Sequence, residues 1–133
     1  MTDYKRFQSV NIINKLGSLS KLISKNDKYF NKFGEAYLTK IKHNKIKGWK
    51  LHKKMISNIF LIKGKVEFVI FKDNKFYKLQ LNKNFNRIFI NKNTYFAFKG
   101  LSEKESILIN FSSTVHDKNE SETIPLKKFS YKW

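Results

Sequence analysis

Residues 66–81 read VEFVIFKDNKFYKLQL, and this stretch decides the fold class. Two runs of β-branched and aromatic residues, Val66–Phe71 and Phe76–Leu81, lie on either side of Asp73 and Asn74. Such runs favour strands. Aspartate and asparagine suit the tight turn that joins two neighbouring strands. The stretch therefore predicts a β-hairpin.

Further short runs of the same kind precede and follow this hairpin, with Asn, Gly and Ser between them. They are Ala36–Ile41, Ile46–His52, Met55–Ile62, Arg87–Ile90, Tyr95–Phe98 and Ile107–Phe111. Short strands at this close spacing are typical of an all-β barrel or sandwich. A chain of 133 residues has the size of a single domain.

The two ends of the chain differ from this pattern. Residues 1–33 hold one short strand, Val10–Ile13, and otherwise predict an extended arm with loops, so we divide the chain into an arm (1–33) and a barrel (34–133). His116–Glu122 is polar and predicts a loop. Tyr131 and Trp133 predict a tail that docks on the protein, because a free tail rarely carries two such side chains.

Composition limits the class of protein further. The chain has no cysteine, which excludes disulfide scaffolds and thiolate metal sites. No apolar run approaches the roughly 20 residues of a membrane span, and the N-terminus lacks the apolar core of a secretion signal. We therefore expect a cytoplasmic protein with no membrane partner.

The formal net charge of +18 has two interpretations. A basic chain favours anionic partners such as nucleic acids or phosphorylated ligands. However, all of the 28 basic residues except Arg6 and Arg87 are lysines, and arginine is the preferred contact for phosphate and guanine. Lysine and asparagine also have A- and T-rich codons, so genome bias alone accounts equally well for a solvated lysine surface. A nucleic-acid partner is the less favoured class.

The histidines are too few for a metal site. Metal-binding β-barrels need three or four convergent His and carboxylate ligands. The chain has only His43, His52 and His116, and the two that are expected on adjacent strands have no acid nearby. We therefore expect no bound metal and no other cofactor.

Basic and aromatic side chains mix in the segment Lys47–Met55. Alternate side chains of a strand share a face, so Lys50 and His52 point one way while Trp49 and Leu51 point the other. One parity places Lys50 and His52 inside a barrel. The opposite parity places Trp49 and Leu51 in the core and the polar pair in water, and periodicity alone leaves both open.

Several segments resemble, in the same order, those of the dTDP-4-dehydrorhamnose 3,5-epimerase-like cupins, from about residue 34 to the end. They are Gly34–Leu38, Ile46–Met55, Gly64–Phe71, Tyr95–Leu101, Ile107–Phe111, His116–Glu120 and Tyr131–Trp133. The resemblance implies an all-β, cupin-type jelly-roll barrel that binds a nucleotide-linked sugar without a metal. It also implies a homodimer, often with an N-terminal strand shared between subunits, which gives residues 1–33 a role.

The chain departs from this family at its functional motif of arginine, glycine, any residue and histidine. The matching residues are Lys47–Lys50, so Lys50 occupies the position of the family's catalytic base. A second family histidine falls on Phe96, and the loop near the family's tyrosine acid holds His116. The carboxylate that pairs with the family's catalytic histidine has no clear equivalent.

The family reaction needs a base beside a 4-keto group, a cation for the enolate oxygen and an acid. The resemblance assigns Lys50 as that cation or, with a lowered pKa, as the base. It assigns His116 to the second proton transfer. The expected substrate-binding residues are Lys47, His52, Tyr37 and Trp49.

Two functions therefore stay open. The first is a nucleotide-sugar epimerase or isomerase that acts on a 4-keto sugar nucleotide, which Lys50, His52 and His116 favour. The second is a non-catalytic cupin that binds a nucleotide sugar or a partner enzyme, which the missing family histidines favour. A basic barrel that binds RNA or single-stranded DNA is a third and less favoured class.

Overall fold

Strands make up most of the molecule, which is described by a computed structural model over residues 2–133. Within these residues, twelve strands precede one short 3₁₀ turn, Leu126–Lys128. The strands are β1 (Tyr4–Phe7), β2 (Asn11–Asn14), β3 (Gly17–Ser20), β4 (Glu35–Ile41), β5 (Ile46–His52), β6 (Ser57–Lys63), β7 (Val66–Lys72), β8 (Lys75–Leu81), β9 (Arg87–Ile90), β10 (Tyr95–Gly100), β11 (Ser106–Ser112) and β12 (Ser121–Thr123).

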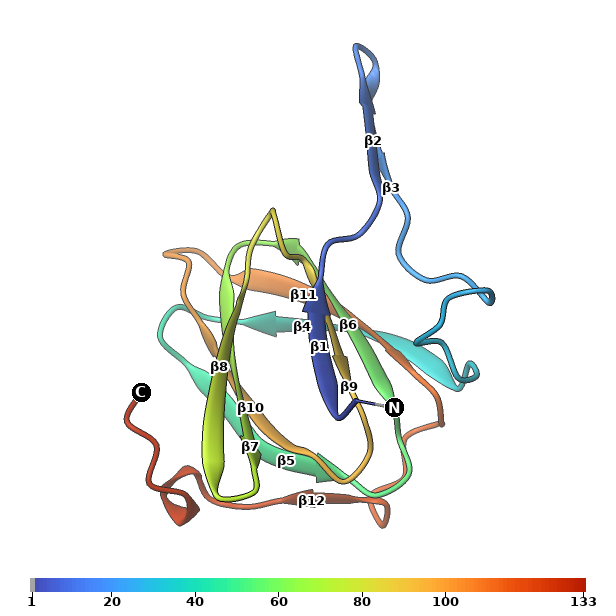
Figure 1. The fold of residues 1–133 in the computed structure, drawn as a ribbon. Coiled ribbons are helices and arrows are strands. Elements are labelled where there is room, and N and C mark those ends of the chain that lie inside the picture. Colours follow the sequence, from blue (N-terminus) through green and yellow to red (C-terminus); the bar gives the residue numbers. More distant parts are fainter. Residues whose placement is uncertain (1) are drawn as a thin grey trace.

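The strands form two antiparallel sheets and one separate hairpin (Figure 1). The first sheet has the order β1-β9-β6-β11-β4 and the second the order β12-β5-β10-β7-β8. Successive strands β4 to β7 alternate between the two sheets, so the chain winds around a shared interior as in a jelly roll. The all-β barrel expected from the sequence is confirmed.

The hairpin expected over residues 66–81 is β7 and β8. Its central residues Asp73 and Asn74 have φ angles of 52° and 59°, and Lys72 lies opposite Lys75. Two consecutive positive φ angles give the turn whose twist matches that of the strands it joins. The local turn chemistry therefore fixes the register of this hairpin.

An apolar core fills the space between the inner faces of the sheets. Phe68 and Ile70 of β7 and Ile88 and Ile90 of β9 belong to it, and all four are buried. Their spacing of two residues is the one that places side chains on one face of a strand. Both strands therefore contribute one face to the interior of the barrel.

A second apolar cluster covers the outer face of the second sheet. Its centre is Trp49 of β5, which is 0% exposed. The ring centroids of Phe129 and Trp133 lie 5.3 and 5.9 Å from that of Trp49, and the indole Nε1 donates a hydrogen bond to the carbonyl of Leu126, at 3.1 Å. The expected docking of the C-terminal tail is confirmed, and its partner is the back of β5.

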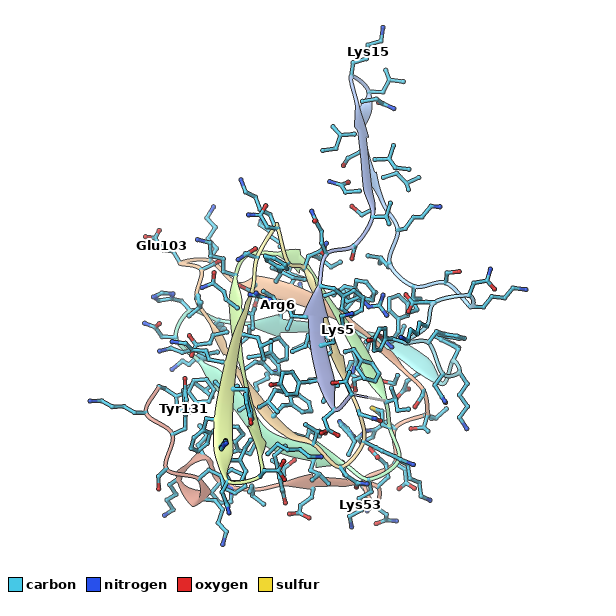
Figure 2. All side chains as sticks on the ribbon, in the orientation of Figure 1. Lys5, Arg6, Lys15, Lys53, Glu103 and Tyr131 are labelled. Carbon is cyan, nitrogen blue, oxygen red and sulfur yellow. The ribbon has the colours of Figure 1, made fainter. Side chains whose placement is uncertain are left out.

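The N-terminal residues do not form one continuous arm. β1 pairs with β9 at the edge of the first sheet, so residues 4–7 belong to the barrel and the division at residue 33 is wrong for this strand. Its four residues, YKRF, show no continuous apolar run, so the strand could not be recognised from the sequence without its partner β9. Beyond β1, the hairpin of β2 and β3 projects away from the barrel, with Lys15 at its tip (Figures 1 and 2).

An ion pair between the buried Arg87 and the half-buried Asp27 attaches the segment after this hairpin to the barrel. Arg87 of β9 is 4% exposed. Its guanidinium donates to Asp27 at 2.5 Å and to Asn58 at 2.6 Å, and it stacks on the ring of Phe7 at 4.1 Å. The pair anchors the loop that precedes β4.

The polar segment before the C-terminal tail contains a strand where the sequence predicted only a loop. Ser121–Thr123 forms β12 and pairs with His52, Leu51 and Lys50 of β5. Its three residues, SET, have no apolar pattern, so only the pairing with β5 defines it. This short strand places the end of the preceding loop beside His52.

No helix within residues 2–133 has the length and apolar character needed to cross a membrane. The cytoplasmic location expected from the sequence stays a prediction.

Trp49→Ala should lower the free energy of unfolding by about 3–5 kcal/mol, because it leaves a large cavity among the aromatic rings. Phe33→Ala is the matched control, since Phe33 is 63% exposed and surface substitutions usually change stability by less than about 0.5 kcal/mol. Urea unfolding of the two variants measures both values. Equal losses of stability would show that the C-terminal tail does not bury Trp49 in solution.

Candidate active site

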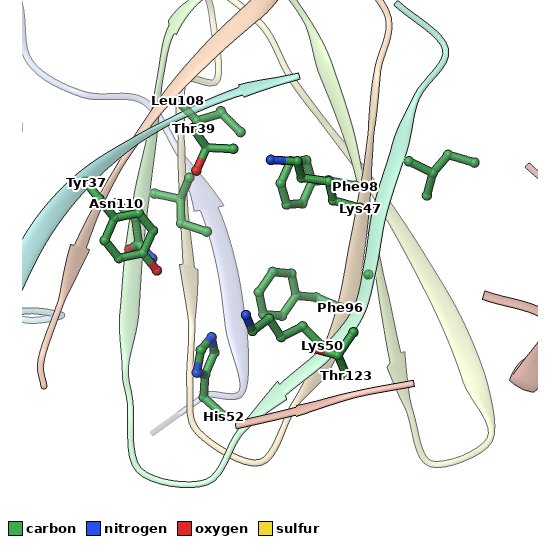
Figure 3. A pocket seen from close by; sticks show the side chains of 13 residues that line it. Tyr37, Thr39, Lys47, Lys50, His52, Phe96, Phe98, Leu108, Asn110 and Thr123 are labelled. Carbon is green, nitrogen blue, oxygen red and sulfur yellow. The ribbon is translucent and has the colours of Figure 1, made fainter. Parts of the chain in front are cut away.

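A cavity of about 460 Å³ lies between the two sheets (Figure 3). Its floor shares Ile59, Phe96 and Leu108 with the apolar core. Side chains of β4 and β11 line one wall, and side chains of β5 and β10 line the other. Of the residues singled out from the sequence, the cavity brings together Tyr37, Lys47, Lys50 and His52.

A β-bulge in β5 turns two lysines toward this cavity. Lys50 pairs with Phe96 of β10 and Lys47 pairs with Phe98, so one residue of β10 faces two residues of β5. The extra residue interrupts the alternation of side chains along the strand. Lys47 and Lys50 therefore both line the cavity, whereas strict alternation would have placed them on opposite faces.

Gly48 makes this bulge possible. Its φ angle is 138°, and a Cβ at this position would lie 2.5 Å from the Cβ of Ala97. Only glycine adopts this backbone at such a close approach without displacing the neighbouring strand. The bulge therefore depends on the glycine of the motif that the sequence singled out.

Trp49 lies outside the cavity. Its side chain points to the outer face of the sheet and is enclosed by the C-terminal aromatic residues. The predicted contact of Trp49 with a substrate does not agree with this placement. Of the two parities that the sequence left open, the structure has the one that turns Lys50 and His52 into the barrel and buries Trp49 on the opposite face of β5.

His52 forms the central contact of the site with Glu120. The imidazole Nδ1 lies 2.5 Å from a carboxylate oxygen of Glu120, and the two residues are 6% and 4% exposed. The other carboxylate oxygen accepts hydrogen bonds from the backbone N–H groups of Lys54 and Met55, at 3.1 and 3.2 Å. When Nδ1–H donates to the carboxylate, Nε2 is left as an acceptor toward the cavity.

This carboxylate could not be recognised from the sequence, and the expectation that no acid lies near the strand-borne histidines is wrong. Glu120 stands 68 residues after His52, in the segment predicted as a polar loop. The pairing of β12 with β5 brings the two side chains together. One feature of the sequence could have pointed to Glu120. It lies in His116–Glu120, a segment that resembles the family's loop after the strand corresponding to Ile107–Phe111.

Burial is the largest influence on His52 and lowers its pKa, and the charges of Lys50 and His116 lower it further. The hydrogen bond and charge of Glu120 oppose these effects without overcoming them. Burial alone would raise the pKa of Glu120, but the hydrogen bonds from His52 and from the backbone of Lys54 and Met55 outweigh it and lower this pKa. At neutral pH, His52 is therefore a neutral base beside an ionised carboxylate.

Lys47 and Lys50 bring positive charge to the cavity. Among the described residues, no carboxylate lies within 4 Å of either amine. In Figure 3 the amine of Lys50 extends toward the imidazole of His52. Lys50 is half-buried, whereas Lys47 is exposed. An ammonium that is partly removed from water without a partner is costly, so Lys50 favours a ligand with negative charge in the cavity.

His116 does not line the cavity. It lies on an exposed loop, where its backbone N–H donates to the carboxylate of Glu35 at 2.7 Å. Its charge influences His52, but its side chain is not on the wall of the site. The acid role expected for His116 therefore has no support from its placement.

No group of three His, Asp or Glu side chains suited to holding a metal occurs in the part of the chain that the structure describes. The expectation of a metal-free protein stays a prediction.

The family model described as "FdtA: WxcM-like, C-terminal" matches residues 2–124. The chain belongs to this family. The match covers every strand of the barrel and both members of the His52–Glu120 pair. A comparison with curated proteins finds no match.

Solved structures share the fold of this FdtA-family chain. A dTDP-sugar isomerase from Desulfovibrio desulfuricans G20 superposes with a TM-score of 0.89 at 18% identity, over 98% of this chain and 90% of the other. A 3,4-ketoisomerase from Helicobacter canadensis gives 0.82 at 22% identity, over 97% and 96%. The 3'-monoepimerase ChmJ from Streptomyces bikiniensis, crystallised as a double mutant with dTDP, gives 0.85 at 7% identity, over 98% and 74%. The expected kinship with dTDP-sugar epimerase-like cupins is confirmed at the level of the fold.

Glu120→Gln should lower the pKa of His52 further below its ordinary value, because the exchange removes the negative charge that opposes the effect of burial. NMR titration of the histidine ring protons measures this pKa. Glu122→Gln is the matched control on the neighbouring strand, since the carboxylate of Glu122 contacts Tyr95 instead. An unchanged or raised pKa of His52 in Glu120→Gln would contradict the pairing.

Proposed function

We propose that this protein is a nucleotide-sugar isomerase or epimerase, which moves a proton of a 4-keto sugar nucleotide through an enolate. The observation that carries the proposal is a neutral, buried histidine, His52, held by Glu120 and facing a cavity that also contains two lysines without carboxylate partners. Proton abstraction beside a ketone needs this combination of a base and a cation.

The residues divide the chemistry among them. Nε2 of His52 removes the proton from the carbon beside the ketone, and Glu120 stabilises the imidazolium that forms. The amine of Lys50, which extends toward His52 (Figure 3), stabilises the charge that develops on the enolate oxygen. Lys47 contacts the diphosphate. The family resemblance allowed Lys50 to be either base or cation, and the proximity of a neutral His52 supports the cation.

The solved structures named above that match this chain over at least 90% of their own length are isomerases, which favours isomerisation over epimerisation as the reaction. This chain spans 90% and 96% of the isomerase and the ketoisomerase, but 74% of the 3'-monoepimerase. We therefore take a shift of the keto group between neighbouring sugar carbons as the first candidate reaction. A thymidine diphosphate sugar is the first candidate substrate, since the Desulfovibrio protein is named as a dTDP-sugar isomerase and the 3'-monoepimerase was crystallised with dTDP.

TDP-4-keto-6-deoxyglucose in D₂O should exchange the proton beside its ketone when the protein is added. His52→Asn and Lys50→Met should each slow this exchange about 100-fold or more, because they remove the base and the cation of the enolate. Proton NMR follows the exchange, and calorimetry with TDP measures binding, which should change little.

Lys53→Met is the control for these variants, since Lys53 extends from the outer surface near the end of β5 (Figure 2). The Lys53→Met protein should catalyse the deuterium exchange at the wild-type rate. If the wild-type protein binds the sugar nucleotide but catalyses no deuterium exchange, the isomerase proposal is wrong. The non-catalytic, nucleotide-sugar-binding cupin would then be the remaining hypothesis. Unchanged exchange in Lys50→Met would remove Lys50 from the site.

We further propose that the protein acts as a homodimer. The projecting hairpin exposes Ile13 and Leu16 by 73% and 90%, together with Val10, Ile12 and Leu19. Several apolar side chains exposed to this extent on one small element mark a surface that another protein covers. A second copy of the chain is the partner that the resemblance to the dimeric cupins implies.

Ile13→Asp combined with Leu16→Asp should shift the protein from a dimer to a monomer, because two charges would enter the apolar contact. Light scattering at micromolar concentration measures the mass. Lys15→Asp changes a charge at the tip of the same hairpin without removing an apolar side chain, and it should stay dimeric. A wild-type mass equal to that of one chain would contradict the dimer.

A further inference from the structure

The C-terminal end of the chain is bound to both the backbone and the side chain of Trp49. The backbone N–H of Trp49 donates to the carbonyl of Ile124 at 3.2 Å, and the N–H of Ile124 donates to the carbonyl of Trp49 at 3.0 Å. The indole Nε1 of Trp49 donates to the carbonyl of Leu126 at 3.1 Å. Residues 124–133, which we call the C-terminal strap, therefore hold Trp49 by three hydrogen bonds.

Aromatic rings of the C-terminal strap add to this hold on Trp49. The ring centroids of Phe129 and Trp133 lie 5.3 and 5.9 Å from that of Trp49, and the ring of Tyr131 meets the same indole edge-on at 6.4 Å. Phe129 also stacks on Phe71 of β7, with the centroids 3.9 Å apart. The strap, which follows β12 on the outside of the barrel (Figure 1), therefore ties Trp49 to a second strand of the same sheet.

Trp49 stands inside the bulge of β5. The register between β5 and β10 shifts between the pairs Lys50–Phe96 and Lys47–Phe98, and Trp49 lies in that interval. The strap provides the backbone hydrogen bonds of Trp49 on the edge of β5 that faces away from β10. It therefore holds the irregular part of the strand at the point where the pairing with β10 is interrupted.

The bulge decides the direction of Lys47 and leaves that of Lys50 unchanged. Regular alternation already places Lys50 and His52 on one face. Lys47 stands three residues before Lys50, so regular alternation would turn it to the outer face together with Trp49. Only the extra residue of the bulge brings Lys47 to the cavity (Figure 3). Relaxation of the bulge would therefore remove Lys47 from the cavity and leave Lys50 and His52 in place.

We propose that the C-terminal strap is a positioning element for nucleotide binding, with Phe129 and Trp133 as its positioning residues. They hold Trp49, Trp49 holds the bulge, and the bulge keeps Lys47 at the cavity. The match to the family model ends at residue 124, so the family assignment gives the rest of the strap no role. The inference rests on the proposed function, in which Lys47 contacts the diphosphate, and adds residues outside the cavity that set the affinity for the nucleotide.

Trp133→Ala and Phe129→Ala each loosen the strap without changing a residue that lines the cavity. Each should raise the Kd for TDP about 3-fold or more, because the Kd rises as the fraction of molecules with Lys47 at the cavity falls. Lys47→Met should raise the same Kd about 10-fold, the loss expected when one charged hydrogen bond to a phosphate is removed. Calorimetry with TDP measures all three values. Trp133 is the last residue of the chain, so Trp133→Ala decides the outcome if Phe129→Ala does not fold.

A double-mutant cycle separates this effect from a general loss of stability. When Trp133→Ala is introduced into Lys47→Met, the Kd for TDP should change by less than about 2-fold, because the lysine through which the strap acts is already absent. With saturating TDP-4-keto-6-deoxyglucose, Trp133→Ala should catalyse deuterium exchange within about 3-fold of the wild-type rate, since Lys50 and His52 keep their places. A strap that only stabilises the fold would lower the melting temperature and leave the Kd unchanged.

Two controls accompany these variants. Trp133→Phe keeps a ring against Trp49 and removes only an indole N–H that is buried without a hydrogen-bond partner among the described residues, so it should restore binding to the wild-type level. Phe33→Ala removes an exposed ring, 63% accessible to solvent, outside the strap, and should also bind TDP as the wild type does.

Two results would overturn the inference and leave the proposed function standing. One is wild-type binding of TDP by Trp133→Ala, and the other is an equal loss of affinity from Trp133→Ala with and without Lys47. If Lys47→Met binds TDP as tightly as the wild type, both this inference and the diphosphate contact of Lys47 are wrong. A wild-type protein that does not bind TDP would overturn the inference together with the proposed function.

Discussion

Strand β5 has to satisfy two opposite environments, and the bulge at Gly48 allows it to do so. On its outer face Trp49 is enclosed by aromatic rings of the C-terminal segment, and burying an indole of this size contributes about 4 kcal/mol. On its inner face Lys47, Lys50 and His52 gather positive and basic groups in one cavity. A regular strand could not place both lysines inward and the tryptophan outward. The arrangement of charged and basic side chains in the cavity therefore depends on the bulge at Gly48, and the burial of Trp49 on the other face of the sheet holds that bulge in place.

The contact between His52 and Glu120 extends this anchoring to a second segment. Glu120 receives hydrogen bonds from the backbone that follows β5 as well as from the imidazole. The carboxylate therefore holds the histidine tautomer and also fixes the end of the strand that carries it. Because burial keeps His52 neutral while the hydrogen bonds keep Glu120 ionised, the pair is ready to accept a proton near neutral pH. The large positive charge of the chain has little part in this arrangement, since only two of its lysines line the cavity.

The sequence predicted those features that depend on local chemistry. The turn at Asp73 and Asn74, the strand Ile46–His52 and the docking of the C-terminal aromatics all follow from residue types and short-range patterns. Features that arise when segments far apart in the sequence pair as strands could not be predicted from it. β1 and β12 lack an apolar pattern and exist because β9 and β5 supply their hydrogen bonds. Glu120 reaches His52 only through the second of these pairings, and the inward direction of Lys47 comes from a register shift that periodicity does not contain.

Two contacts attach the chain to the barrel on either side of the β2–β3 hairpin, so the hairpin itself is not constrained by the packing of the barrel strands. One anchor is the pairing of β1 with β9, and the other is the ion pair between Asp27 and Arg87. Both anchors end on the same strand, β9, so the chain leaves and re-enters the barrel at neighbouring points. The intervening segment can therefore change in length or sequence without moving a residue of the cavity. A binding surface on this hairpin could therefore acquire a new partner through substitutions that leave every residue lining the cavity unchanged.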